Sequence, residues 1–182
     1  MELILPSTEN ANQLKGERIF LHPGEVYFGD SNCQIHTLLG SCIAITLWHP
    51  RLRVGGMCHF VLAGSQQKVH EGQVSQPITG RYSNDAMALL EKEVSIRNTV
   101  IKDYQAKIFG GSNMLTNSTL EKDEQIGNRN TQAALALLSK HNVNLLVAHV
   151  GETGHRRIVF DISTGDVWVK HTPLRKIIAH NQ

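Results

Sequence analysis

Short stretches of alternating apolar and polar residues dominate the chain and predict mainly β-strands. We expect these strands at 18–21, 25–28, 43–48, 54–62, 106–109, 143–150, 157–162 and 167–170. Turn-forming residues separate several of them, and Ser163-Thr164-Gly165-Asp166 is typical of a hairpin. For 43–48, a short helix that begins near Cys42 is an alternative.

Two segments have helical periodicity instead. One begins at Ser83 or Asn84, and the other runs from about Asn130 to Lys140. Their inward-facing residues are predicted to be Met87, Leu90 and Val94 in the first, and Ala134, Leu135 and Leu138 in the second. Strands outnumber helices, and the last two strands form an antiparallel hairpin. The predicted fold class is therefore α+β with a mixed or antiparallel sheet, not a doubly wound parallel one.

The length of 182 residues is most simply explained by one domain. Residues 1–16 are polar and aperiodic and predict a flexible N-terminal extension, so the domain is expected to cover 17–182. The polar stretches 63–80 and 113–125 are predicted to be long surface loops, which are the places where substrate recognition is often found.

Composition narrows the class of protein. Hydrophobic residues make up 41% of the chain and charged residues 19%, which is typical of a soluble globular protein. A formal charge of +2 without a dense Lys/Arg run argues against nucleic-acid binding. No signal peptide is visible and no apolar stretch is long enough to cross a bilayer, so we predict a cytoplasmic protein.

The three cysteines do not form a disulfide-rich pattern, and Cys33 and Cys58 are interpreted as buried free thiols. Cys42 differs because it ends the segment Gly40-Ser41-Cys42, where small residues allow backbone N–H groups to gather round the sulfur as an oxyanion site requires. We interpret Cys42 as a hydrolase nucleophile with His59 as its base. The alternatives are a small buried residue in a tight turn and a structural histidine.

The position of His59 supports this pairing. If 43–48 and 54–62 are adjacent antiparallel strands, the turn near 49–52 lies about midway between Cys42 and His59 and brings them together. With a period of two, Cys58 faces away from His59, which argues against Cys58 as the nucleophile. The hydroxyl of Thr37 could orient the imidazole, although a β-branched strand residue is the simpler explanation of Thr37.

Two further motifs have weaker support. Gly110-Gly111-Ser112-Asn113 follows a strand and could bind an anion or a substrate backbone, but a tight turn at the strand end is the simpler explanation. Five histidines (His141, His149, His155, His171 and His180) are scattered, and neither HExxH nor CxxC occurs. A zinc site formed by Cys42, His59 and His149 is a weak alternative.

Several motifs together resemble the CheD family of chemoreceptor glutamine deamidases, from about Pro23 to Lys170. They are Leu39-Gly40-Ser41-Cys42, Val54-Gly55-Gly56-Met57 with His59-Phe60, Arg81-Tyr82, Ala106-Lys107-Ile108-Phe109-Gly110-Gly111 with Met114, and Ile126-Gly127-Asn128-Arg129-Asn130. The sequence departs from the family at His149-Val150-Gly151-Glu152, where many relatives have an acidic residue and paired glycines. It also has Ala63-Gly64 where a proline is usual.

The resemblance implies an activity and a fold. CheD-like proteins hydrolyse the side-chain amide of particular glutamines in methyl-accepting chemotaxis receptors, without a metal or organic cofactor. The family nucleophile falls on Cys42 and its histidine on His59, and the third site residue is Thr37, with His36 as the alternative. The fold implied is a layered α/β sandwich similar to the catalytic domain of cytotoxic necrotising factor toxins.

The resemblance also implies partners. Chemoreceptors are the expected substrates, and CheD-like proteins bind a CheC-type phosphatase that acts on the response regulator CheY. An alternative function is therefore a regulatory binding module of the receptor array, with catalysis secondary. A zinc-dependent or small-molecule amidase is a third, weaker possibility.

Overall fold

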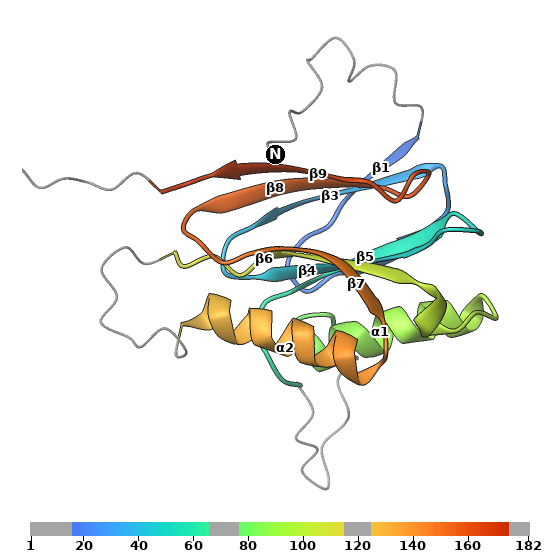
Figure 1. Ribbon diagram of the computed structural model, residues 1–182, viewed down its shortest axis with the longest axis horizontal. Coiled ribbons are helices and arrows are strands. Elements are labelled where there is room, and N and C mark those ends of the chain that lie inside the picture. The colour runs from blue at the N-terminus through green and yellow to red at the C-terminus, as the bar shows by residue number, and fades with distance from the viewer. Residues whose placement is uncertain (1–15, 66–76, 115–124, 175–182) are drawn as a thin grey trace, which may run out of the picture.

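The computed structural model describes residues 16–65, 77–114 and 125–174, which stack as a sheet, a second sheet and a pair of helices (Figure 1). The four-stranded sheet has the order β1 (Glu17–Phe20), β3 (Cys33–Leu39), β8 (His155–Asp161), β9 (Val167–Thr172). The five-stranded sheet has the order β2 (Val26–Gly29), β5 (Val54–Phe60), β4 (Ile43–His49), β6 (Gln105–Gly110), β7 (Asn144–Val150). The helices are α1 (Ser83–Ile96) and α2 (Ile126–Lys140), with a short 3-10 turn, η2 (Ile101–Asp103).

Each sheet is mixed. Strand β1 runs parallel to β3 and β6 runs parallel to β7, whereas the other neighbouring strands are antiparallel. The predicted α+β class with mixed sheets and outer helices is confirmed. The C-terminal hairpin is also confirmed, because β8 and β9 pair from His155–Thr172 to Phe160–Val167.

Most predicted elements form, with two corrections. Residues 43–48 lie in strand β4, so the alternative of a helix near Cys42 is wrong. Helix α2 begins at Ile126 rather than near Asn130. The predicted start was too late because the first turn packs through buried Gly127, which leaves no apolar signal in the sequence. Strand β3 was not predicted, because its buried Gln34 and Thr37 interrupt the apolar pattern that marks a central strand.

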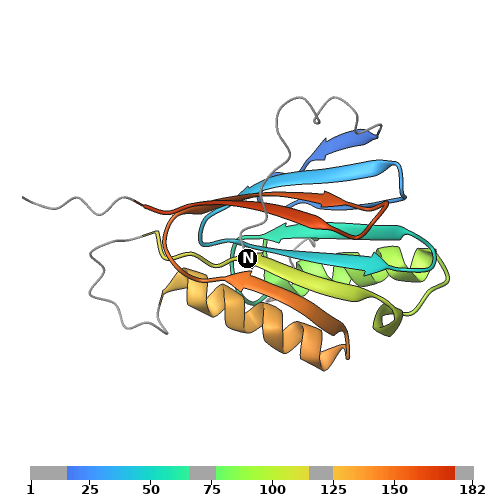
Figure 2. The same ribbon diagram turned by 45° about the horizontal axis from the view of Figure 1, so that its top comes forward.

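The five-stranded sheet separates two hydrophobic cores. Both helices cover one of its faces, where the predicted inward residues Met87, Leu90 and Val94 pack with Cys58 (Figures 1 and 2). The other face packs against the four-stranded sheet through a second core that includes Ile35, Leu39, Ala44, Met57, Ile158 and Phe160. Burial of apolar surface on both faces is the main stabilising contribution to such a layered arrangement.

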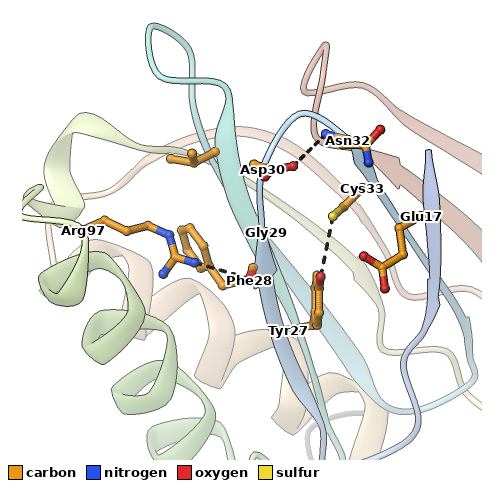
Figure 3. Close-up of a pocket in the computed structure, with 9 residues that line it drawn as sticks. Glu17, Tyr27, Phe28, Gly29, Asp30, Asn32, Cys33 and Arg97 are labelled. Carbon is orange, nitrogen blue, oxygen red and sulfur yellow. Dashed lines mark hydrogen bonds between the residues drawn. The ribbon is translucent and has the colours of Figure 1, made fainter. Parts of the chain in front are cut away.

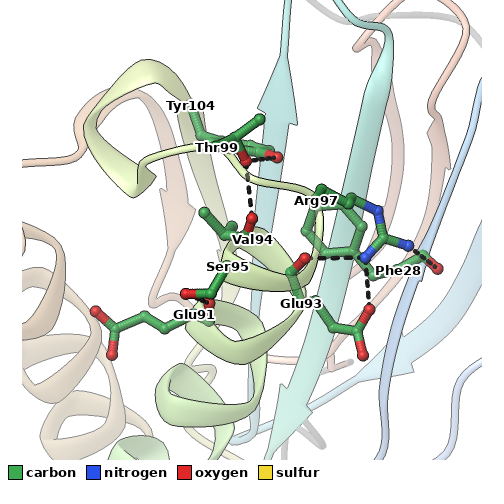
Figure 4. A network of polar contacts seen from close by, with 8 residues as sticks. All are labelled: Phe28, Glu91, Glu93, Val94, Ser95, Arg97, Thr99 and Tyr104. Carbon is green, nitrogen blue, oxygen red and sulfur yellow. Dashed lines mark hydrogen bonds and ion pairs between the residues drawn. The ribbon is translucent and has the colours of Figure 1, made fainter.

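Polar contacts fasten the end of α1 to the edge strand β2 (Figure 4). The Arg97 guanidinium lies over the ring of Phe28, 4.3 Å from its centre, and binds the Glu93 carboxylate at 2.6 Å. Just beyond the helix, the Thr99 hydroxyl lies 2.9 Å from that of Tyr104. A cation over an aromatic face and a partly buried ion pair each add modest stability, so this end of α1 is held on the sheet.

Some predictions fall on other parts of the chain. Residues 1–15 of the predicted extension, most of the loops 63–80 and 113–125, and His180 lie outside the described residues. The helices that the structure describes include none with the length and hydropathy to span a membrane.

Candidate active site

The segment Gly40-Ser41-Cys42 is the bend that carries the chain from β3 in one sheet to β4 in the other. Cys42 is half-buried and packs against the edge of the core between the sheets. A cysteine that is neither fully buried nor freely exposed can meet a substrate while its surroundings remain fixed. The bend therefore places this thiol at the end of the inter-sheet core.

His59 lies on the same face of the five-stranded sheet as Cys42. Strands β4 and β5 are antiparallel neighbours, as predicted, and Ala44 pairs with His59. Paired residues project to one face, and so do residues two apart on a strand, so Cys42 and His59 both project toward the space between the sheets. Cys58 projects the other way into the helix-side core, where burial raises the pKa of its thiol to about 12.

Thr37 of β3 reaches His59 of β5 across the two sheets. The Thr37 Oγ1 lies 2.9 Å from His59 Nδ1 and donates its hydrogen to the Leu21 carbonyl at 2.7 Å. A hydroxyl has one hydrogen and a carbonyl can only accept, so the Thr37 oxygen must accept from Nδ1–H. This contact assigns the imidazole the Nδ1–H tautomer and leaves the lone pair on Nε2.

The remaining ring nitrogen is available as a base. His59 is 2% exposed, and its Nε2 is buried without a hydrogen-bond partner among the described residues. Burial lowers the pKa of His59 to about 4, although the Leu21 carbonyl and the Glu25 carboxylate oppose this effect. An unpartnered buried acceptor costs folding free energy, so its presence points to a functional use.

The Cys42 thiol is protonated at neutral pH in the resting protein. Burial raises its pKa, and the backbone N–H of Cys42 and the positive charge of Arg81 only partly offset this. With the pKa of His59 held low, the resting pair is a neutral thiol and a neutral imidazole rather than a thiolate–imidazolium ion pair. Proton transfer must then accompany attack on the substrate.

Each carbonyl of the bend accepts a hydrogen bond from a residue of another segment. The Gly40 oxygen accepts from the Ser112 N–H at 2.9 Å, the Cys42 oxygen from the Gly111 N–H at 2.8 Å, and the Ser41 oxygen from the side-chain amide of Asn130 at 2.9 Å. In a trans peptide the C=O and the following N–H point in opposite directions. The N–H groups of Ser41 and Cys42 therefore point away from these anchors, as donors to an oxyanion would.

The glycines that the sequence singled out lie around this bend. A Cβ on Gly110, whose φ is +108°, would lie 2.1 Å from the Cys42 carbonyl oxygen. Gly111 uses its N–H to hold that same oxygen, so this donor is already engaged. On Gly40, a Cβ would lie 3.0 Å from the Met114 sulfur. The Gly110-Gly111 pair thus supports the bend from behind, and direct substrate contact by these glycines stays a prediction.

Three residues that hold the bend were not predicted as site residues. Asn130 and Ser112 supply donors to it, and buried Arg156 donates to the Ser112 hydroxyl and, at 2.8 Å, to His149 Nδ1. One sequence signal was present for Asn130, since it precedes Ala134 by one helical turn and belongs to the inward stripe. Ser112 belongs to the segment after the strand that the sequence offered as an anion site, but its bond to Gly40 and the contacts of Arg156 join segments far apart in the sequence.

The alternatives for the third residue and for a metal do not fit the geometry. His36 projects to the opposite face of β3 from Thr37, where its ring lies 5.0 Å from that of Phe20. His149 is bound to Arg156 rather than grouped with Cys42 and His59. Within residues 16–65, 77–114 and 125–174, no three His, Cys, Asp or Glu side chains are placed to hold a metal ion.

Cys33 has different surroundings from Cys42. It lies beside a cavity of about 420 Å³, with its sulfur 3.5 Å from the Tyr27 hydroxyl (Figure 3). The hydrogen bond with Cys33 and burial raise the pKa of Tyr27 to about 12, so this phenol stays protonated at neutral pH. None of the predicted site residues lines the cavity. The prediction that Cys33 and Cys58 are buried free thiols is confirmed.

The structure thus combines a half-buried thiol at a bend with a buried imidazole that a hydroxyl orients, and among the described residues no hydrogen bond joins His59 Nε2 to Cys42. These are the groups that cysteine-dependent hydrolases use. A family model described as CheD chemotactic sensory transduction matches residues 62–171. The match begins after Cys42 and His59, so their roles depend on the geometry and the resemblance.

Similar proteins extend the comparison over most of the chain. One from Dechloromonas aromatica, named probable chemoreceptor glutamine deamidase CheD 3, is 45% identical over 151 residues, or 83% of this chain and 85% of the relative. The probable chemoreceptor glutamine deamidase CheD of Pseudomonas savastanoi pv. phaseolicola is 42% identical over 160 residues, or 87% of each chain. A relative in Leptospira interrogans is 33% identical over 158 residues, or 84% of this chain and 91% of its own. The chain belongs to the CheD family.

The low pKa of His59 predicts a pH-dependent stability. An unfolded histidine has a pKa near 6.5 and the folded His59 about 4, so between these values the unfolded chain binds more protons and stability rises with pH. The contribution of His59 to the free energy of unfolding is on the order of 3 kcal/mol. It is present above pH 6.5 and is lost as the pH falls toward 4. Urea denaturation from pH 4 to pH 7 measures it.

His59→Gln is the comparison for this experiment. Its free energy of unfolding should depend less on pH, but some dependence remains because burial also lowers the pKa of His36 and His149. Identical pH dependence in the two proteins would contradict the assignment.

Proposed function

We propose that this protein hydrolyses the side-chain amides of glutamines in chemoreceptors to glutamates, with Cys42 as the nucleophile and His59 as the base. The observation that carries the proposal is the contact of Thr37 with both the Leu21 carbonyl and His59 Nδ1, because it leaves Nε2 as a proton acceptor. The substrate class comes from the CheD relatives, which are named as probable chemoreceptor glutamine deamidases.

The chemistry follows from a neutral starting pair. His59 Nε2 takes the Cys42 proton as the sulfur attacks the glutamine carbonyl carbon, and a tetrahedral oxyanion forms. When this intermediate collapses, the imidazolium returns the proton to the departing nitrogen, which leaves as ammonia, and a thioester remains. Water, deprotonated by the same Nε2, then attacks the thioester and releases the glutamate carboxyl and the thiol.

The bend provides the electrostatic part of catalysis. The N–H groups of Ser41 and Cys42 stabilise the oxyanion, because the donors that hold the carbonyls at Gly40 and Ser41 fix their direction. A preorganised donor of this kind is worth roughly 2.7–4 kcal/mol of transition-state stabilisation. Such donors need no reorganisation during the reaction, which matters for a weakly activated thiol.

A cavity of about 730 Å³ lies next to Gly111, which holds the Cys42 carbonyl of the bend. Its lining is mostly uncharged, and it includes Asn113, Asn128, Thr131 and Thr153. Side-chain amides and hydroxyls can hydrogen-bond to the backbone and amides of a polypeptide substrate. Because this cavity lies on the anchored side of the bend, we assign it to a part of the receptor segment away from the reacting glutamine. A cytoplasmic location and a fold similar to cytotoxic necrotising factor catalytic domains remain parts of the proposal that rest on the resemblance.

Replacement of the nucleophile is the first test. A purified chemoreceptor cytoplasmic domain treated with the native protein should gain about one dalton at each modified glutamine, since –NH₂ is replaced by –OH through the thioester. Cys42→Ala should give no gain, and Cys33→Ala, which removes a different buried thiol, should act like the native protein. Peptide mass spectrometry measures all three.

Turnover by Cys42→Ala at the native rate would rule out the mechanism. If the native protein modified no receptor tested, a regulatory binding role would gain support. Capture of a CheC-type phosphatase by native and Cys42→Ala proteins would then test that role.

The orienting hydroxyl can be tested at Thr37. Thr37→Val keeps the shape of the side chain and removes the hydroxyl, so the tautomer of His59 is no longer fixed and kcat should fall by about a hundredfold or more. Thr37→Ser retains the hydroxyl and should remain within about tenfold of the native kcat. Ammonia release during receptor turnover gives both rates. Equal rates for Val and Ser would show that the hydroxyl has no part in the reaction.

A further inference from the structure

Asn130 is a polar side chain buried on the inner face of α2, where it is 1% exposed. Ala134 and Leu138 follow on the same face and pack into the helix-side core. An amide in such surroundings costs folding free energy unless its donors and acceptors are matched. The hydrogen bonds of the Asn130 amide therefore indicate its role in the structure.

The Asn130 Nδ2 donates to two carbonyls on different segments. One is that of Ser41, at 2.9 Å, and the other is that of Val61, at 2.8 Å. Ser41 directly precedes Cys42, and Val61 follows His59 by two residues. One NH₂ group thus connects the segment that carries the thiol to the segment that carries the imidazole.

The strand pairing stops where this connection begins. The last pair of the β4–β5 ladder is Ile43 with Phe60, so Cys42 and Val61 lie just beyond it. Beyond this pair no ladder hydrogen bond joins the two segments to each other, and each is held by a different neighbour, Cys42 by Gly111 and Val61 by Arg81. Asn130 bridges them there.

Close packing of α2 on β6 allows the side chain to reach this point. A Cβ on Gly127 would lie 2.4 Å from the Gly111 carbonyl oxygen, and one on Gly111 would lie 2.2 Å from the Thr131 hydroxyl. The first turn of α2 therefore approaches the strand backbone more closely than larger residues would permit. Asn130 lies three residues after Gly127, on the same side of the helix.

We propose that Asn130 is a positioning residue for the reaction: it fixes the distance between Cys42 and His59 and directs the Cys42 N–H toward the oxyanion. The expected effect on the rate of deamidation rests on the proposed function, whereas the expected effect on the alkylation of Cys42 does not. A displacement of order 1 Å at a reacting centre can cost about a hundredfold in rate. Asn130 needs two N–H donors for this role, and a side chain of similar size without them does not suffice.

Two variants test the donors. Asn130→Asp keeps the size but places a carboxylate against two carbonyl oxygens, and Asn130→Ser has one donor and a shorter reach. Leu138→Ala is the matched control, since it perturbs the same buried face of α2 two turns further along. Urea denaturation first establishes that each protein folds and how much stability each has lost.

The measurements are kcat and KM for receptor deamidation, and the pH midpoint of iodoacetamide alkylation at Cys42 without substrate. We expect kcat of a folded Asn130 variant to fall about tenfold to a hundredfold, with a smaller change in KM. The alkylation midpoint should rise, because the thiolate loses its aligned N–H. Leu138→Ala should keep the native kcat and midpoint once its lower stability is allowed for.

The outcomes separate this inference from the proposed function. If the native protein deamidates and folded Asn130 variants match Leu138→Ala in kcat and midpoint, the inference is overturned while the function stands. If no receptor is deamidated but the midpoint still rises in the Asn130 variants only, the function fails and the positioning role stands. If neither Asn130 variant folds, the residue serves folding alone and the inference is overturned.

Discussion

The site depends on one hydrogen bond between the two sheets, from His59 Nδ1–H to the Thr37 oxygen. Each partner belongs to a different sheet, so the bond forms only when the layers have packed at their native separation. The Leu21 carbonyl completes it by taking the Thr37 hydrogen. Tertiary packing thereby decides which imidazole nitrogen is basic, which no local sequence feature could do.

This arrangement lowers the stability of the folded protein. His59 is buried with an unpartnered nitrogen, and a neutral, solvated histidine on the surface would stabilise the fold more. Burial of Cys42 likewise holds its thiol protonated. A neutral pair avoids a reactive thiolate in the resting protein and delays charge separation until a substrate carbonyl is present. In the proposed mechanism, stabilisation of the oxyanion by fixed N–H groups is then the larger contribution to catalysis.

Three donors from two other parts of the chain hold the bend, so residues distant in sequence affect it. Ser112 and Gly111 hold it from the end of β6, and Asn130 holds it from α2. Arg156 adds a second layer by donating to the Ser112 hydroxyl. Since each carbonyl has its own donor, the peptide planes of the bend have little freedom to rotate. A rigid bend is what a preorganised oxyanion site requires.

The sequence predicted most of the elements because their alternation or helical period is strong. Strand β3 was missed although it carries Thr37, since its buried polar residues are matched only by partners on other elements, such as Asp161 for Gln34. The short turn between β4 and β5 indicated how an antiparallel pairing could bring Cys42 and His59 together, and the period of two separated Cys58 from His59.

Other features of the site were beyond a sequence argument. The choice of Thr37 over His36 required the position of a second sheet, and the role of Asn130 required two carbonyls far away in sequence. The start of α2 was misplaced because close packing by glycine leaves no apolar signal. Contacts between distant segments, rather than local propensity, decide each of these features.

The protonation state of His59 is the most direct test of the central claim. Nitrogen-15 NMR of the native protein at neutral pH distinguishes the two neutral tautomers and the imidazolium. The account predicts a neutral ring with hydrogen on Nδ1 and none on Nε2, and a titration midpoint near 4. A ring protonated on Nε2, or an imidazolium at neutral pH, would contradict it, because Nε2 could not then accept the Cys42 proton.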